Sequence, residues 1–306
     1  MDNRHQQQLI AEIKELRKEK NAIILAHYYQ PNEVQDIADF VGDSLQLAQK
    51  AAATEADVIV FCGVHFMAES AAILSPDKIV LLPDINAGCP MADMVDAEEL
   101  REEKAKHPGT KVVCYVNSSA EVKAESDICC TSSNAQKVVD SLLNEDILFV
   151  PDENLGKFVA AKANKKIKYW PGFCPTHHRL GKEDVLKARA ENPEAKVLVH
   201  PECREEVWKE ADYVGSTAGI IKYAESSPAK EFIIGTECGI LHELQKRCPD
   251  KKFYMASDDM RCPNMKKTSL QKVRDALRNL SPQITVPEEI RLKAIGALER
   301  MLTVSK

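Results

Sequence analysis

Three short stretches in which a cysteine precedes a proline decide the fold of this chain: NAGCPMADM at residues 86–94, PGFCPTHHRL at residues 171–180 and MRCPNMKK at residues 260–267. Cys89, Cys174 and Cys262 therefore follow one another at intervals of 85 and 88 residues. Such nearly equal spacing predicts an internal repeat, because repeated units carry their characteristic residues at corresponding positions.

Four short apolar segments, rich in Val, Ile and aromatic residues, precede each of these cysteines. They cover residues 22–28, 37–44, 56–63 and 78–84, then 111–116, 126–132, 145–152 and 166–172, then 196–200, 211–217, 230–237 and 251–257. Strands that are apolar on both faces and alternate with helices are typical of parallel sheets covered on both sides. We therefore expect an α/β fold of three pseudo-threefold-related, three-layer αβα domains, each with a short parallel sheet.

The repeat also predicts where the domains begin and end. The expected domains cover residues 1–90, 91–175 and 176–263, and a helical tail of residues 264–306 packs on the body. Each domain opens with a helix, and Asp96 is the expected N-cap of the second one. In the tail, Thr268 is the expected N-cap of the first helix and Pro287 a first-turn proline of the second.

Polar residues recur in step with the cysteines at the ends of two strands in each unit. His27 with Tyr29, Tyr115 with Asn117, and His200 with Glu202 end the first strands, whereas Ser44, Ser132 and Ser216 with Thr217 follow the second strands. These hydroxyl residues are natural N-caps for the next helices. Because ligands bind at the carboxyl ends of parallel strands, we expect all of them to meet at one central domain junction, together with His177 and the three cysteines.

Charge and hydropathy exclude several classes of protein. The chain has 306 residues, with 41 Lys and Arg against 47 Asp and Glu, and this net charge of -6 without an evident basic patch argues against nucleic-acid binding. No apolar run approaches the roughly 20 residues that span a bilayer, and the N-terminal residues lack the apolar stretch of a signal peptide. We therefore expect a cytoplasmic protein that binds neither membranes nor nucleic acid.

Ten cysteines are many for such a protein. A disulfide framework is not expected in the cytosol, so metal binding, redox chemistry or packing must account for them. Seven are expected to be packing residues: Cys62, Cys114, Cys129, Cys130, Cys203, Cys238 and Cys248. The three that precede proline suit either zinc or a [4Fe-4S] cluster with one iron open, and a site without metal stays an alternative at this point.

The side chains expected beside these cysteines suit acid–base chemistry. His27, His177 and His200 are candidate proton carriers because imidazole titrates near neutral pH. Tyr29 and Tyr115 can donate hydrogen bonds to developing charge, and Glu202 can accept a proton. Helix N-termini with hydroxyl caps favour a substrate that carries several carboxylates or a phosphate.

Seven segments together resemble the quinolinate synthase family, whose members are [4Fe-4S] enzymes of NAD biosynthesis. They are ILAHYYQ, IADFVGDSLQLA, CPMADM, YVNSSAE, VHPEC, ADYVGST and CPNMKK, and they occur in the family's order over nearly the whole chain. The resemblance implies three α/β domains that each contribute one cysteine. This organisation agrees with the repeat.

The resemblance also implies a reaction and its residues. Iminoaspartate and dihydroxyacetone phosphate would condense to quinolinate with loss of phosphate and two waters, and an aspartate-oxidising enzyme would supply the iminoaspartate. Cys89, Cys174 and Cys262 would ligate the cluster, whose open iron would assist dehydration as a Lewis acid. The catalytic residues would be Tyr29, Tyr115, His200 and Glu202. The residues lining the pocket would be His27, Ser44, Tyr115, Asn117, Ser132, His177, His200, Glu202, Ser216 and Thr217, with Ser132 rather than Ser133 facing the ligand.

Two other functions are compatible with three cysteines around a cluster. One is a radical enzyme like those of diphthamide synthesis, which cleave S-adenosylmethionine. The other is a cluster-containing sensor or ligand-binding protein without turnover. The many paired acid–base candidates favour an enzyme.

Overall fold

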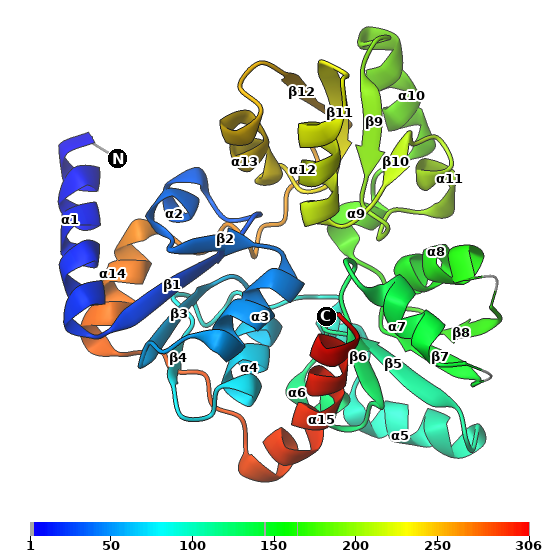
Figure 1. Cartoon of the computed structure of the whole chain (residues 1–306), viewed down its shortest axis with the longest axis horizontal. Coiled ribbons are helices and arrows are strands. Elements are labelled where there is room, and N and C mark those ends of the chain that lie inside the picture. Colours follow the sequence, from blue (N-terminus) through cyan, green and yellow to red (C-terminus); the bar gives the residue numbers. More distant parts are fainter. Residues whose placement is uncertain (1–2, 144, 164, 306) are drawn as a thin grey trace.

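The computed structural model of the chain describes residues 3–143, 145–163 and 165–305. Its three four-stranded sheets share one strand order, namely β2-β1-β3-β4, β6-β5-β7-β8 and β10-β9-β11-β12 (Figure 1). Neighbouring strands within each sheet are parallel. The predicted α/β fold of three similar αβα units is therefore confirmed, and every predicted strand segment contains a strand.

The first sheet lies between two layers of helices. Its strands are β1 (Ala22–His27), β2 (Phe40–Gly42), β3 (Val58–Cys62) and β4 (Ile79–Leu81). Helices α1 (Asn3–Glu19) and α2 (Asn32–Ile37) cover one face, and α3 (Ser44–Ala53) and α4 (His65–Leu74) cover the other. Because successive strand residues point to opposite faces, Ile24 packs with the α1 layer and Leu25 with the α3 layer.

The second and third sheets repeat this arrangement. The second unit contains β5 (Lys111–Tyr115), β6 (Ile128–Cys130), β7 (Ile147–Val150) and β8 (Ile167–Tyr169), with η1 (Ala92–Met94), α5 (Ala97–Lys106), α6 (Ala120–Ala124), α7 (Ala135–Ser141), α8 (Glu153–Ala163) and α9 (Pro175–His178). The third contains β9 (Lys196–Val199), β10 (Tyr213–Val214), β11 (Glu231–Gly235) and β12 (Lys252–Met255), with α10 (Lys182–Glu191), α11 (Glu205–Trp208), α12 (Thr217–Ser226) and α13 (Ile240–Arg247). The three units surround a common centre (Figure 1).

The tail forms two helices that return to different units. Helix α14 (Leu270–Asn279) packs on α1, whereas α15 (Glu288–Val304) packs on α4, α6 and β6 and so joins the first two units (Figure 1). The two tail helices therefore contact the first and second units, while the domain division, including the bounds of the tail, stays a prediction. Among the helices of the described residues, none combines the length and apolar character needed to cross a membrane.

The observed N-cap residues agree only in part with those predicted from the sequence. Asp96 caps α5 and Ser216 caps α12, as predicted. Three other predictions are wrong by one or two residues. Ser269 rather than Thr268 caps α14, Asp43 rather than Ser44 caps α3, and Asn134 rather than Ser132 occupies the N-cap position of α7. Pro287 lies at the N-cap position of α15 and not in its first turn.

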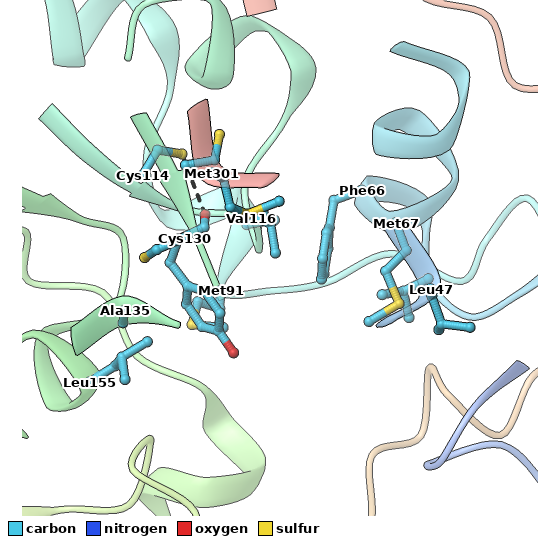
Figure 2. Packing of buried hydrophobic residues seen from close by; sticks show 14 of the residues in the cluster. Leu47, Phe66, Met67, Met91, Cys114, Val116, Cys130, Ala135, Leu155 and Met301 are labelled. Carbon is cyan, nitrogen blue, oxygen red and sulfur yellow. Dashed lines mark hydrogen bonds between the residues drawn. The ribbon is translucent and has the colours of Figure 1, made fainter. Parts of the chain in front are cut away.

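A continuous apolar core joins the units. In Figure 2, Phe66 and Met67 lie across from Cys114 and Cys130, with Met301 of α15 beside the two cysteines. All ten cysteines are free thiols. Of the seven expected as packing residues, all but the half-buried Cys238 are buried, so their surroundings match that interpretation.

Candidate active site and metal centre

A cavity of about 160 Å³ lies where the carboxyl ends of the three sheets meet. Every side chain that the sequence places at this site lines the cavity, except that of Ser216. The lining residues among them are His27, Tyr29, Ser44, Cys89, Tyr115, Asn117, Ser132, Cys174, His177, His200, Glu202, Thr217 and Cys262. Residues far apart in the sequence therefore share one site because each unit sends the same strand ends to the centre.

The three cysteine loops share one local design. In each loop the sulfur accepts backbone N–H groups from residues two or three positions later: Met91 and Ala92 for Cys89, His177 for Cys174, and Asn264 and Met265 for Cys262. The intervening proline has no N–H and fixes its own φ angle, so the chain turns back over the sulfur. Burial raises the pKa of all three thiols, and these N–H groups oppose the rise by stabilising the thiolate.

Two buried carboxylates hold the loops of the second and third cysteines. Asp152 accepts the backbone N–H of Cys174 at 3.2 Å, and Glu237 accepts that of Cys262 at 3.0 Å. Each carboxylate follows the third strand of its unit by two residues, at 0% exposure. The sequence did not reveal them, because the corresponding residue of the first unit is Val64.

Glu202 is the centre of a buried polar group contributed by two units. Its carboxylate lies 2.7 Å from Nδ1 of His177 and accepts the hydroxyl proton of Tyr115. Burial raises the pKa of Glu202, but the neighbouring His177 imidazole and the Tyr115 hydroxyl lower it more, so the pKa lies below its usual value. Glu202 is therefore an ionised carboxylate.

His200 and His27 are neutral. Burial lowers the pKa of each imidazole to about 3. In His200, Nδ1 accepts the backbone N–H of Glu202 at 3.3 Å, so its proton lies on Nε2, which is 3.1 Å from Ser132 Oγ. In His27, Nδ1 likewise accepts the backbone N–H of Tyr29 at 3.1 Å. Both rings therefore have one fixed tautomer, with an N–H at Nε2.

Two threonines hold the hydroxyl of Tyr29. Tyr29 Oη lies 2.8 Å from Thr217 Oγ1 and 2.6 Å from Thr236 Oγ1, and Thr236 Oγ1 also lies 2.9 Å from Nε2 of His177. Burial and the nearby Glu202 charge raise the pKa of Tyr29 well above its usual value. The same two causes raise that of Tyr115. Both phenols therefore remain protonated donors at neutral pH.

Ser132 and Ser133 point to different places. Ser132 lines the cavity and contacts His200, whereas Ser133 donates to the buried Asp43 carboxylate and lies 2.7 Å from Ser216 Oγ. The Ser216 side chain also accepts the backbone N–H of Gly219 as the cap of α12. Ser216 therefore occupies the contact between the units and not the cavity wall.

The cavity lining also contains groups that suit anions and metals. Arg179 follows α9 and is the one lysine or arginine among the described residues that line the cavity. Asn117 lines it as well, and its Oδ1 is buried with no hydrogen-bond partner among the described residues. A further set of three ligand-type side chains, Cys174, His177 and Glu202, has its sulfur, nitrogen and oxygen atoms within 4.8 Å of one another. The cavity thus offers both anion-binding and metal-binding groups.

Fold and site together define a three-unit α/β enzyme in which each unit sends one cysteine to a shared buried site beside acid–base side chains. The family described as quinolinate synthetase A protein (NadA) matches residues 11–303. The quinolinate synthase of Methanosarcina barkeri is 60% identical over 299 residues, which cover 98% of both chains. That of Dehalococcoides mccartyi strain CBDB1 is 59% identical over 292 residues, covering 95% of this chain and 97% of the relative.

A third relative, the quinolinate synthase of Desulforudis audaxviator, is 58% identical over 298 residues, covering 97% of this chain and 98% of the relative. The chain therefore belongs to the quinolinate synthetase A family, and it is an enzyme of the quinolinate synthase type, which serves NAD biosynthesis.

Proposed function

We propose that this chain condenses iminoaspartate with dihydroxyacetone phosphate in the cytoplasm and closes the pyridine ring of quinolinate. One phosphate and two waters leave, so the atoms balance without an oxidant or reductant. The observation that carries the proposal is the convergence of three thiols, two protonated phenols and one ionised carboxylate in a single buried cavity. Family membership supplies the identity of the product.

Cys89, Cys174 and Cys262 would hold a [4Fe-4S] cluster with one iron free of protein ligands. The donor set fits, because one thiol from each unit lines the cavity and each sulfur accepts backbone N–H groups, as ligating thiolates commonly do. When bound, the open iron supplies a Lewis acid that assists the departure of a hydroxyl group as water.

A single zinc ion is the second candidate for this centre. The Cys174, His177 and Glu202 ligand atoms lie within 4.8 Å of one another, and sulfur, imidazole nitrogen and carboxylate oxygen are all zinc ligands. This set of three ligands leaves out Cys89 and Cys262, although both line the same cavity and their sulfur atoms also accept backbone N–H groups. The three-thiol cluster accounts for all of these features and is preferred.

The chain's own side chains supply the proton transfers. Tyr29 and Tyr115 are protonated donors, so they can polarise the carbonyl oxygen of the triose. Glu202 is ionised and accepts a proton from the condensing substrate, then returns it to a departing hydroxyl group. The Nε2–H group of His200 is fixed by the backbone of Glu202 and donates to oxygen atoms near Ser132.

The substrates' negative charges would be bound by groups at the ends of two helices. Ser44 and Thr217 lie in the first turns of α3 and α12, where backbone N–H groups and the helix dipole favour anions. Arg179 offers a guanidinium for a carboxylate or phosphate. The partnerless Asn117 Oδ1 would accept an N–H or O–H of the substrate. These local groups offset the repulsion expected from the net charge of -6.

The direct test is turnover under anaerobic conditions. Iminoaspartate, generated from aspartate by an aspartate-oxidising enzyme, is mixed with dihydroxyacetone phosphate and the cluster-loaded chain. Quinolinate and phosphate are expected in equal amounts. Release of neither product would support a sensor instead, and cleavage of S-adenosylmethionine by the reduced chain would support a radical enzyme.

A further inference from the structure

The turn after β11 carries a carboxylate that no step of the proposed reaction uses. Glu237 is fully buried, and its Oε1 accepts the backbone N–H of Cys262 at 3.0 Å. Its Oε2 accepts the backbone N–H of Gly239 at 2.7 Å and the ammonium group of Lys266 at 2.9 Å. Three N–H donors and the Cys238 thiol, which lies 3.7 Å from Oε1, therefore fix both oxygen atoms, and the carboxylate cannot turn without losing buried hydrogen bonds.

Lys266 connects this carboxylate to another unit. Its side chain is 13% exposed, and Nζ also donates to the backbone carbonyl of Tyr29 at 2.5 Å. The backbones are in close contact as well, since a Cβ atom at Gly239 would lie 2.7 Å from the Cα atom of Tyr29. The ion pair of Glu237 and Lys266 is thus bonded to the backbone of Cys262 on one side and to that of Tyr29 on the other.

The other two units lack this connection. Asp152 holds Cys174 in the second unit, but among the bonds of the described residues its oxygen atoms accept backbone N–H groups, those of Cys174, Leu155 and Asn154, and no side-chain cation. The first unit has Val64 at the corresponding place. The pairing of a carboxylate with a lysine that reaches a catalytic loop is therefore specific to the third unit.

We propose that Glu237 and Lys266 are positioning residues that hold Cys262 in place to bind metal and fix that place relative to Tyr29. The inference rests on the proposed function, in which Cys262 is a cluster ligand and Tyr29 acts on substrate. Groups that orient metal ligands commonly change metal affinity by about 10- to 100-fold when they are removed. Loss of the pair should therefore weaken the cluster and misplace Tyr29 together.

The test is Glu237→Gln in the full-length, cluster-loaded chain. The glutamine has the same shape, but its NH₂ group must face at least one of the donors that the carboxylate oxygen atoms accept. Iron loss to a chelator under anaerobic conditions is expected to become about 10- to 100-fold faster. Glu243→Gln is the matched control, because Glu243 is a buried carboxylate of α13 that pairs with Arg247 at 2.8 Å outside the cavity lining.

The double variant Glu237→Gln with Lys266→Met distinguishes the loss of positioning from the damage that a buried unpaired charge would cause. It removes both charges, so iron loss is expected to be slower than in Lys266→Met alone, which leaves a buried carboxylate without its cation. The EPR spectrum of the reduced cluster should change in the single variants but not in Glu243→Gln. The double variant also serves as the test protein if Glu237→Gln does not fold.

Equal rates of iron loss and equal EPR spectra in the Glu237 variants and in Glu243→Gln would overturn the inference. Failure of the proposed function gives a different result. In that case, Cys262→Ala itself would keep a full cluster, whereas failure of the inference alone leaves Cys262→Ala without a cluster and the Glu237 variants unaffected.

Discussion

Thr236 is the side chain whose removal tests the arrangement around Tyr29 most cleanly. Its hydroxyl is fully buried and lies between Tyr29 Oη at 2.6 Å and His177 Nε2 at 2.9 Å. His177 Nδ1 faces the Glu202 carboxylate at 2.7 Å, so Thr236 is the hydrogen-bond partner of the other ring nitrogen, Nε2. Thr236→Val keeps the shape of the side chain and removes the hydroxyl.

The geometry sets the size of the expected effect. Tyr29 keeps its contact with Thr217 at 2.8 Å, whereas the buried His177 Nε2 loses its hydrogen bond to Thr236. An unsatisfied buried polar group costs about 1–3 kcal/mol. If this cost falls on the transition state, kcat decreases about 5- to 150-fold, since about 1.4 kcal/mol corresponds to a factor of ten.

Anaerobic turnover, measured as quinolinate and phosphate, provides the assay. Thr236→Ser retains the hydroxyl and should keep kcat within about threefold of the unmodified chain, and the iron content should be unchanged in both variants. The reasoning is refuted if Thr236→Val is as active as Thr236→Ser, or if the serine variant is as impaired as the valine variant.

Three further predictions follow from other residues. Glu202→Gln should lower kcat by about 10²- to 10⁴-fold with iron content unchanged, because it removes the proton acceptor; near-normal turnover would contradict this role. Ser269→Ala should lower the free energy of unfolding by about 1 kcal/mol in denaturant titrations, because it removes the N-cap of α14. An unchanged denaturant midpoint would count against this cap, and the exposed Thr303→Ala on α15 is the control. Hydrogen bonds from Lys168 and Lys106 lower the pKa of Glu103 to about 2, so the stability they give is complete above the ordinary pKa near 4.5 and is lost as the pH falls toward 2. The Glu103→Gln variant should lack that part of the acid dependence, and a parallel pH profile for the two proteins would contradict the pairing.

The sequence predicted the strands and most of the central site because both depend on repeated patterns. Strands covered on both faces are short continuous apolar runs, and the polar residues that end them recur at similar distances in the three units. Parallel strands that end at one junction then bring His27, Tyr115 and Glu202 together without further information. The cysteine intervals therefore indicated a shared site before any contact was known.

The parts that the sequence did not predict depend on single units or on single residues. Asp152 and Glu237 follow third strands by two residues, but the first unit has Val64 there. Thr236 follows its strand directly, where the other units have Gly63 and Pro151, so repetition gave no indication of these residues. Adjacent hydroxyl residues such as Thr268 and Ser269 compete for one cap, and only backbone geometry decides which one is used. Ser216 was expected at the cavity, but the residue caps α12 and contacts Ser133 between the units.

Iron and sulfide content of the anaerobically loaded chain tests the central claim most directly, namely that one cysteine from each unit holds a single cluster. About four irons and four sulfides per chain are expected. Cys89→Ala, Cys174→Ala and Cys262→Ala should each lose the cluster, whereas Cys203→Ala, buried outside the cavity lining, should keep it. A full cluster in any of the first three variants, or one zinc ion in place of iron, would contradict the account.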